Sequence, residues 1–429
     1  IFQHAVSLRR SGHEVTLLTE TPVTSDDVSW HPDASELRFA TYAECEQEHF
    51  DIALATWWRT VYLLPQVRAR VHAYFVQSIE SRFYPASDGA AFYWAEATYG
   101  LDLPIVTEVS WIRDYLREHH ARDAIVARNG IRKDIYTAAG PAVSPRNPQR
   151  PRILVEGTLG VFFKNVERTI ELCRQSDAPE IWLMTPTKGV SDYDGVDRVF
   201  SAIPVEKTAE VYRSCDVLVK LSTVEGMFGP PLEMFHCGGT AVVYNVTGYD
   251  EYIRDGYNAL VSQMHDEESV VENINALIHD SQLRARLQEG ALRTAQLWPD
   301  WPEASRVFEQ AVLHLATGES EDPPLLAAKC RLYQRWYERH VNVQQLLEKR
   351  EGQAVVDLQN DFSRAYQRLQ HVEHCLRLAR QEAADYRATL EAVQRSKSFR
   401  LMQKVRKLPG VSALSRHSLR SRRTSLKRW

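Results

Sequence analysis

Two glutamates stand eight residues apart around a glycine-spaced loop, in the stretch EGMFGPPLEMFH that begins at Glu225. Carboxylates only accept hydrogen bonds, which suits them to sugar hydroxyl groups. The loop follows the apolar run 216–222, so Glu225 lies at the carboxyl end of a predicted strand, where open α/β sheets bind ligands. Gly226 and Gly229 let the backbone turn sharply and approach a ligand closely.

A helix is predicted to begin directly after this loop, because Pro230 and Pro231 fit the first positions of a helix. The free N–H groups of such a helix start form an anion site, most naturally for phosphate. Glu233 then falls in the first helical turn, where the helix dipole favours a carboxylate. Each glutamate alone also fits an ordinary role, as a solvated loop residue or a dipole-favoured helix residue. Together they suit a ligand with hydroxyl groups and phosphate, such as a nucleotide sugar.

A third charged residue lies upstream, in the stretch ILVEGTLGVFFKN. A predicted strand ends there at Glu156 and Gly157, and Lys164 opens the following helix. A lysine at this place presents a compact charge that can neutralise a leaving phosphate. An ordinary surface lysine fits the segment equally well.

The elements that must position these residues are short apolar runs that alternate with helical stretches. Near-continuous apolar runs indicate parallel strands covered on both faces. Two sets of runs, separated by the Pro- and Ala-rich segment 137–152, predict an α/β protein with two doubly wound domains that face each other across a cleft. The predicted strands are 14–19, 36–40, 51–56, 73–77, 105–109, 124–128, 152–157, 180–185, 198–203, 216–222, 240–245 and 259–262.

Four parts are expected along the chain. A Rossmann-like domain over residues 1–140 precedes a second one over residues 150–318. A helical coiled-coil extension follows over residues 325–395, and a basic tail over residues 396–429. Because the sequence opens inside a helical pattern that leads into a strand, the first strand of the first domain is expected to be missing.

The extension shows a heptad pattern. Apolar residues recur at alternating spacings of three and four from Val355 to Val393. A seam of that length favours a coiled coil over a single packed helix. Ala365, Ala379 and Ala383 in the seam bring helices close together, so we expect a homodimer through residues 355–393.

Charge is distributed unevenly in the chain. Residues 395–429 carry twelve Lys or Arg and no Asp or Glu, whereas the other 394 residues carry 40 basic and 56 acidic side chains. Basic residues mixed with apolar ones favour peripheral contact of the tail, residues 396–429, with an anionic membrane. A flexible tail or a nucleic-acid contact is the alternative, although the net charge of −4 suggests no nucleic-acid partner.

The six cysteines have no zinc-like spacing, and no run of eighteen apolar residues occurs. Reduced, buried thiols and no membrane-spanning helix are therefore expected. We expect a cytoplasmic protein, held at the inner face of the membrane by its tail.

The pattern E-G-x-F-G-P-P-L-E, followed by VTGYDEYIRDGYNALV, resembles the donor site of family 4 retaining glycosyltransferases of the GT-B fold. The segments EG…FKN, SGHEVTLLT and VARNGIRKDIY are similar to other elements of that family. YFVQSIESRFYP is similar to a stretch of bacterial members that build rhamnose- or mannose-containing surface polysaccharides. The resemblance covers roughly residues 1–315 and is strongest over 153–262. It implies an N-terminal acceptor domain and a C-terminal donor domain.

Residue roles follow from this resemblance. It implies that Glu225 contacts the donor sugar hydroxyls, Glu233 the ribose, and Lys164 the diphosphate. The family works without a metal, and its usual Arg before the Lys is replaced here by Glu156-Gly157-Thr158, which leaves half of the phosphate clamp unassigned. The other donor-binding residues implied are Gly157, Thr223, Gly226, Met227, Phe228 and Gly229.

Acceptor-binding candidates lie in the first domain. Gln77 and Glu80 follow the predicted strand 73–77 on the cleft face, although an ordinary loop fits them equally well. Trp57 and Trp58 follow strand 51–56, where they either stack on a sugar ring or pack in the core.

Together with these residues, the resemblance implies a retaining, metal-independent hexosyltransferase without a cofactor. It passes a sugar from a nucleotide sugar to a glycan or lipid-linked acceptor of a bacterial surface polysaccharide, such as O-antigen or capsule. Two alternatives stay open. A nucleotide-sugar epimerase of the same fold would need further acid–base groups in the cleft, and a non-catalytic assembly protein would act through its coiled coil.

Overall fold

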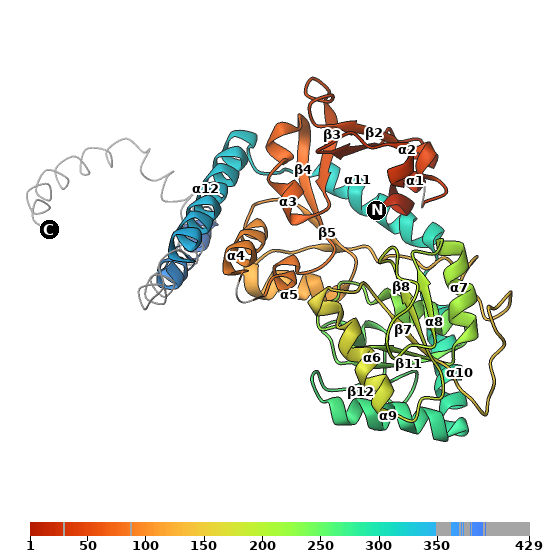
Figure 1. The fold of residues 1–429 in the computed structure, drawn as a ribbon. Helices are drawn as coiled ribbons and strands as arrows, with labels where there is room; N and C mark the ends of the chain where they lie inside the picture. The colour runs from red at the N-terminus through yellow and green to blue at the C-terminus, as the bar shows by residue number, and fades with distance from the viewer. Residues whose placement is uncertain are drawn as a thin grey trace, which may run out of the picture. The chain divides into compact units, whose positions relative to one another are not determined.

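The computed structural model of the chain describes residues 1–28, 31–85, 88–348, 362–368, 370, 372, 378, 380–388 and 391. The chain forms two compact units, Ile1–Val341 and Asn342–Trp429. All strands of the described residues lie in the first unit, which contains two α/β domains (Figure 1). In the second unit the stretches 362–368 and 380–388 are helical.

The N-terminal domain contains six parallel strands in two sheets. One sheet pairs β1 with β2, and the other has the order β3-β4-β5-β6. The strands are β1 (Thr16–Thr19), β2 (Arg38–Thr41), β3 (Phe50–Ala55), β4 (Ala69–Val76), β5 (Ile105–Thr107) and β6 (Ile125–Val126). The helices are α1 (Phe2–Arg10), α2 (Ser25–Val28), α3 (Trp58–Val61), α4 (Gly89–Thr98) and α5 (Ser110–His120).

The C-terminal domain is built on one six-stranded parallel sheet of order β12-β11-β10-β7-β8-β9. The strand order reverses between β10 and β7, which are direct neighbours. The strands are β7 (Ile153–Glu156), β8 (Ile181–Thr185), β9 (Arg198–Ser201), β10 (Val217–Lys220), β11 (Thr240–Tyr244) and β12 (Leu260–Ser262). The helices are α6 (Val166–Gln175), α7 (Val205–Ser214), α8 (Gly229–His236), α9 (Glu267–His279) and α10 (Ser281–Leu297).

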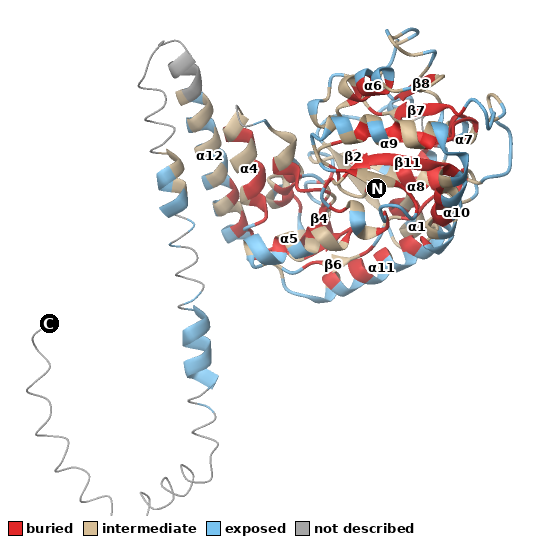
Figure 2. Ribbon diagram, turned by 90° about the horizontal axis from the view of Figure 1, so that it is seen from below, coloured by how far each residue is buried: buried red, intermediate tan, exposed pale blue. Residues whose placement is uncertain are grey.

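The sheets confirm the strand prediction, since every predicted run overlaps one of the observed strands. In β8, β10 and β11 every residue is buried, because helices cover both faces of the sheet (Figure 2). Strands of this kind lose the alternation of polar and apolar residues, which is why continuous apolar runs identified them.

Helix α11 (Trp301–Thr317) follows the C-terminal domain in sequence but packs on the N-terminal sheet (Figure 1, cyan). The Phe308 ring stacks on His4 at 4.0 Å and meets Phe75 edge-on at 5.2 Å. This corrects the predicted boundary of the donor domain at residue 318. The apolar spacing of a helix shows that it has a buried face, but not which sheet that face covers.

Helix α12 (Pro323–Glu348) also joins the N-terminal domain at its start. Leu326 and Cys330 belong to the core of that domain, and the rings of Trp94 and Tyr337 stack at 4.0 Å. The predicted extension therefore begins as part of the first unit. About half of the heptad region 355–393 and the whole tail 396–429 lie outside the described residues, so the dimer and the membrane contact stay predictions.

A search of the described residues finds no helix with the length and apolar character required to cross a membrane.

The packing of α11 generates a prediction about stability. Phe308→Ala should lower the free energy of unfolding by about 3–5 kcal/mol, because it empties a buried ring site between α11 and the N-terminal strands. Urea unfolding followed by circular dichroism measures the change. Leu313→Ala on the same helix is the control, because its side chain is 47% exposed and should change stability by about 0.5 kcal/mol or less. Equal effects of both changes would contradict the assignment of α11.

Candidate active site

The site forms where the carboxyl ends of β7 and β10 lie side by side. Ligands of open α/β sheets bind at such a switch point of strand order. The chain after β7 passes through a short 3-10 turn that ends at Lys164, and the chain after β10 leads through Glu225 into α8. The Lys164 amine donates to Glu225 Oε2 at 2.8 Å. The structure therefore brings together the two residues that the sequence suggested for catalysis.

A second lysine, which the sequence reading missed, lies beside this pair. Lys220 is the last residue of β10 and is only 3% exposed. Its amine donates to Glu156 Oε2 at 2.7 Å and lies 3.9 Å from Glu225 Oε1. Although burial alone would lower the pKa of Lys220, the carboxylates of Glu156 and Glu225 raise it overall. The lysine therefore stays charged and balances two acidic groups.

The second oxygen of the Glu225 carboxylate is not satisfied by the protein. Glu225 is 7% exposed, and among the described residues its Oε1 has no hydrogen-bond partner. The nearby Ser222 hydroxyl is also buried without a partner. An unsatisfied buried oxygen costs about 1–3 kcal/mol. A hydroxyl group of a ligand would remove this cost.

The start of α8 differs from its prediction in two ways. Gly229 N–H donates to the Met227 carbonyl at 2.9 Å, and the two prolines carry no N–H. Residues 229–231 therefore offer no free N–H group to a phosphate. Glu233 lies beyond the first turn, because α8 begins at Gly229.

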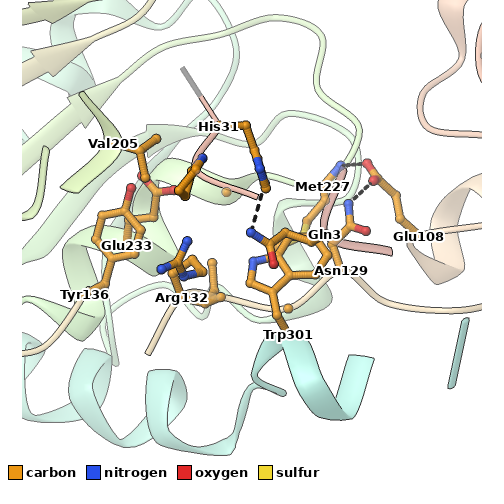
Figure 3. A pocket seen from close by; sticks show the side chains of 14 residues that line it. Gln3, His31, Glu108, Asn129, Arg132, Tyr136, Val205, Met227, Glu233 and Trp301 are labelled. Carbon is orange, nitrogen blue, oxygen red and sulfur yellow. Dashed lines mark hydrogen bonds between the residues drawn. The ribbon is translucent and has the colours of Figure 1, made fainter. Parts of the chain in front are cut away.

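Glu233 lines a cavity of about 340 Å³ between the two domains (Figure 3). Loops of both domains contribute to its wall, together with the start of α11. Lys164 and Glu225 are not part of this lining; they pair with each other at the strand ends. The lining residues are Gln3, His31, Pro32, Glu108, Asn129, Gly130, Ile131, Arg132, Tyr136, Val205, Met227, Gly229, Glu233 and Trp301.

Two carboxyl groups of this cavity hold protons more tightly than usual. Burial raises the pKa of Glu233 to about 7, against the opposite effect of hydrogen bonds from Tyr212 and Tyr136. Burial likewise raises the pKa of Glu108 to about 7, although the Met227 amide donates to it. Both groups can therefore gain or lose a proton near neutral pH.

Several of the remaining residues predicted to bind the donor would reach a ligand mainly through their backbones. Gly157 has φ +151°, and a Cβ there would lie 2.7 Å from Val166. Thr223 N–H donates to the Phe163 carbonyl at 2.8 Å, which ties its loop to the Lys164 turn. The Phe228 ring is buried in the core of the C-terminal domain, so only its backbone is available to a ligand.

The acceptor candidates occupy different environments. Gln77 lies against the loop of residues 225–229, which is called the donor loop below after its predicted role. The Gln77 amide donates to the Thr56 carbonyl at 2.7 Å. Glu80 is buried, and its carboxylate accepts from Trp58 N–H at 2.7 Å and from the Tyr74 hydroxyl at 2.9 Å. The Glu80 side chain is thus hydrogen-bonded within the interior of the N-terminal domain.

The two tryptophans after β3 also differ. Trp58 is fully buried in the core of the N-terminal domain, whereas Trp57 is 39% exposed. Of the two predicted roles, core packing describes Trp58, and sugar stacking stays open for Trp57.

Sequence reasoning missed Lys220, Glu108 and Asn129. Lys220 had one signal, a charged residue at the end of an apolar strand. Glu108 had another, a carboxylate directly after β5. No local pattern connects Lys220 to Glu156 or Glu108 to Met227, because these contacts form only when strands and domains come together.

The described part of the chain contains no group of three or more His, Cys, Asp or Glu side chains placed to hold a metal ion.

Two α/β domains built on parallel sheets, the second with a candidate site at the switch point of its strand order, are characteristic of the GT-B fold. The fold is similar to that of the sucrose-phosphate synthase of Thermosynechococcus elongatus, with TM-score 0.58 and 15% identity over 73% of this chain and 92% of that one. HepE of Anabaena, solved with UDP and glucose, has TM-score 0.57 and 12% identity over 74% of this chain and 95% of that one. At such identities the likeness concerns the fold alone.

Sequence comparison adds a family match. Residues 197–294, which contain Lys220, Glu225 and Glu233, match the family described as Glycosyl transferases group 1. O-antigen biosynthesis protein RfbC of Myxococcus xanthus is 28% identical over 277 residues, 60% of this chain and 20% of RfbC. D-inositol 3-phosphate glycosyltransferase of Stackebrandtia nassauensis is 37% identical over 84 residues, 20% of this chain and 19% of that protein. The chain therefore matches a fifth or less of the length of either relative, and the comparisons support a glycosyltransferase of the GT-B fold.

The raised pKa of Glu233 predicts how stability depends on pH. The folded state binds an extra proton between the ordinary glutamate pKa, about 4.5, and the folded pKa of about 7, so stability should fall as pH rises through that window. Glu233→Gln should remove about 1–3 kcal/mol of this decline. Urea unfolding at pH 5, 6, 7 and 8 measures it.

Glu289→Gln on α10 is the matched control, because that side chain is 65% exposed. A Glu233→Gln protein with the same pH dependence as the parent chain would show that Glu233 ionises normally.

Proposed function

We propose that the chain is a retaining glycosyltransferase that moves a sugar from a nucleotide-sugar donor to a growing surface glycan. The observation that carries this proposal is the buried Glu225 carboxylate, which pairs with Lys164 through one oxygen and leaves the other without a hydrogen-bond partner. A sugar hydroxyl fits the free oxygen, and a diphosphate fits the lysine beside it. One carboxylate thereby places the sugar next to the charge that receives its leaving group.

The donor would be held mainly by side chains of the C-terminal domain. Glu225 Oε1 accepts a hydrogen bond from a sugar hydroxyl, and Glu233 accepts one or two from the ribose. Lys164 has three N–H donors, so its amine can bind a phosphate oxygen while it keeps its bond to Glu225. Lys220 holds Glu156 and Glu225 in place from within the sheet.

The chemical step then needs no protein nucleophile. The acceptor hydroxyl attacks the anomeric carbon on the face from which the diphosphate departs, so the anomeric configuration is retained. A carbon–oxygen bond to the acceptor forms as the bond to phosphate breaks. The acceptor proton passes to the departing phosphate oxygen, and Lys164 stabilises the negative charge that develops there.

The acceptor and the setting are inferred from the relatives. RfbC carries the description O-antigen biosynthesis protein, and HepE was solved with UDP, which supports a nucleotide-sugar donor and a surface polysaccharide as product. Gln77, which lies against the donor loop, and the exposed Trp57 are the proposed acceptor contacts. We place the reaction in the cytoplasm, where nucleotide sugars are made, with the tail at the membrane.

A nucleotide-sugar epimerase of the same fold is the second candidate, and one observation favours it. Glu108 and Glu233 line the cavity with pKa values of about 7, a range suited to proton transfer. Incubation of the full chain with a panel of nucleotide sugars separates the candidates. Transfer releases nucleoside diphosphate in an acceptor-dependent manner, epimerisation yields an isomeric nucleotide sugar, and an assembly protein gives neither.

The two glutamates should fail in different ways. Glu225→Gln should abolish transfer while nucleoside diphosphate affinity changes little, because Glu225 touches the sugar. Glu233→Gln should weaken nucleotide binding by about 1–3 kcal/mol, the value of a charge-assisted hydrogen bond. Calorimetry with UDP and other nucleoside diphosphates measures both. Equal loss of nucleotide binding in the two variants would refute the separate roles.

Divalent metal should be dispensable for transfer. In the proposed mechanism Lys164 neutralises the leaving diphosphate, which is the task that a metal ion performs in other transferases. Turnover is measured in excess EDTA and again after magnesium or manganese is added. Loss of turnover in EDTA with recovery on addition of metal would show that the phosphate site is assigned wrongly.

A further inference from the structure

The loop that carries Glu225 is bonded to the N-terminal domain. The Ser78 hydroxyl donates to the Glu225 carbonyl oxygen at 3.3 Å. The Trp111 indole N–H donates to the carbonyl oxygen of Gly226 at 3.1 Å. Two successive residues of the donor loop are therefore fixed by side chains that belong to the other domain.

Glu108 makes a third contact, to the next residue of the loop. Its Oε1 accepts a hydrogen bond from the Met227 amide at 2.8 Å (Figure 3). This contact has a carboxylate as acceptor, whereas the other two have neutral carbonyl groups. Hydrogen bonds to ionised groups are roughly twice as strong as neutral ones. The Glu108 contact is also the shortest of the three links, and it is strongest when Glu108 is ionised.

The approach of the two domains at this loop requires glycine. A Cβ atom at Gly226 would lie 1.9 Å from the Gln77 carbonyl oxygen and 2.8 Å from Glu108 Oε1. Both distances are well inside van der Waals contact. The loop thus meets the N-terminal domain through backbone alone, which lets side chains of that domain reach its N–H and C=O groups.

Hydrogen bonds to its other carboxylate oxygen, Oε2, hold Glu108 in one orientation. The Asn129 amide donates to Glu108 Oε2, and Asn129 Oδ1 accepts from His4 Nε2 at 3.0 Å. His4 Nδ1 lies 3.1 Å from the Ser305 hydroxyl on α11. Glu108, His4 and Ser305 are all buried. The chain of hydrogen bonds leaves Glu108 Oε1 no alternative to the Met227 amide.

We propose that Glu108 is a positioning residue of the donor site, which holds loop 225–227 against the N-terminal domain and so fixes the carboxylate of Glu225 over the donor sugar. Glu108 acts through the loop backbone, two residues from Glu225. Its kinetic consequence rests on the proposed transferase function, whereas the hold on the loop does not. The two are therefore measured separately.

Glu251 provides a matched control for this proposal. It also joins the two domains, since its carboxylate accepts from the Ser110 hydroxyl and from Trp111 N–H at 3.0 Å, and pairs with Arg128 at 3.3 Å. Among the described residues, Glu251 makes no direct hydrogen bond or ion pair with residues 225–227, and it accepts from the backbone N–H of Trp111, not from the indole that binds Gly226. Glu251→Gln thus weakens the interface without removing a contact of residues 225–227.

Hydrogen–deuterium exchange of the full chain tests the hold on the loop. In Glu108→Ala, a peptide spanning residues 221–232 should exchange about tenfold faster than in the parent protein, because the Met227 amide loses its acceptor. Glu251→Gln should leave that peptide within about twofold. Unchanged exchange in Glu108→Ala, or equal acceleration in Glu251→Gln, overturns the proposal whether or not the chain is active.

Steady-state transfer tests the consequence for the reaction. Glu108→Ala should lower kcat about tenfold or more with nucleoside diphosphate affinity within about threefold, whereas Glu251→Gln stays within about threefold in both. Unchanged kcat alongside accelerated exchange would refute the positioning role.

A conservative pair of variants guards against misfolding. Glu108→Gln keeps an oxygen for Met227 but turns an NH₂ group against Asn129, so it should be impaired. Adding Asn129→Asp places an acceptor opposite that NH₂ group and so reverses the polarity of the contact. In the double variant, both the exchange rate of the peptide 221–232 and kcat should return to within about threefold of the parent values. A double variant that melts like the parent chain but shows neither recovery would overturn the proposal.

Discussion

Two lysines and two glutamates meet where β7 and β10 end, and the two buried ones, Lys220 and Glu225, depend on partners of opposite charge. Lys220 lies inside the sheet and binds Glu156, while Lys164 reaches over from its turn to Glu225. Removal of one partner from such a buried pair costs about 3–5 kcal/mol. The cluster therefore fixes both loops at the switch point, and the free oxygen of Glu225 keeps its place without a ligand.

The position of the two domains depends on chain that returns from the C-terminal domain. Helix α11 completes the core of the N-terminal domain through Phe308, and its Ser305 lies at the end of the hydrogen bonds that reach Glu108. The segment that ends the C-terminal domain thus supports the face of the N-terminal domain that contacts the donor loop. The packing of the N-terminal domain and the proposed position of the donor loop therefore depend on the same helix, α11.

The start of α8 shows that a sequence motif does not by itself establish which N–H groups are free to bind a ligand. A helix that begins Gly-Pro-Pro has an ordinary dipole, yet its prolines carry no N–H and the Gly229 amide is already bonded. The proposed diphosphate would therefore be held mainly by side-chain cations. Lys164 is the one placed beside Glu225 with N–H groups to spare, which gives it more weight than the sequence alone suggested.

The sequence by itself determined the elements and the position of Glu225. The strands are short, apolar and buried on both faces, so a local pattern identifies them, and a glutamate after such a strand must lie at the ligand-binding edge of the sheet. Lys164 followed from the same rule applied to β7. These features depend on residues that are close together in the chain.

Only the tertiary structure decided what surrounds them. Lys220 reaches Glu156 because β10 lies beside β7, and Glu108 reaches Met227 because two domains meet at Gly226. The destination of α11 is likewise invisible in its own spacing. Each of these contacts joins residues far apart in sequence, and their free energy exists only once the strands have paired and the domains have packed.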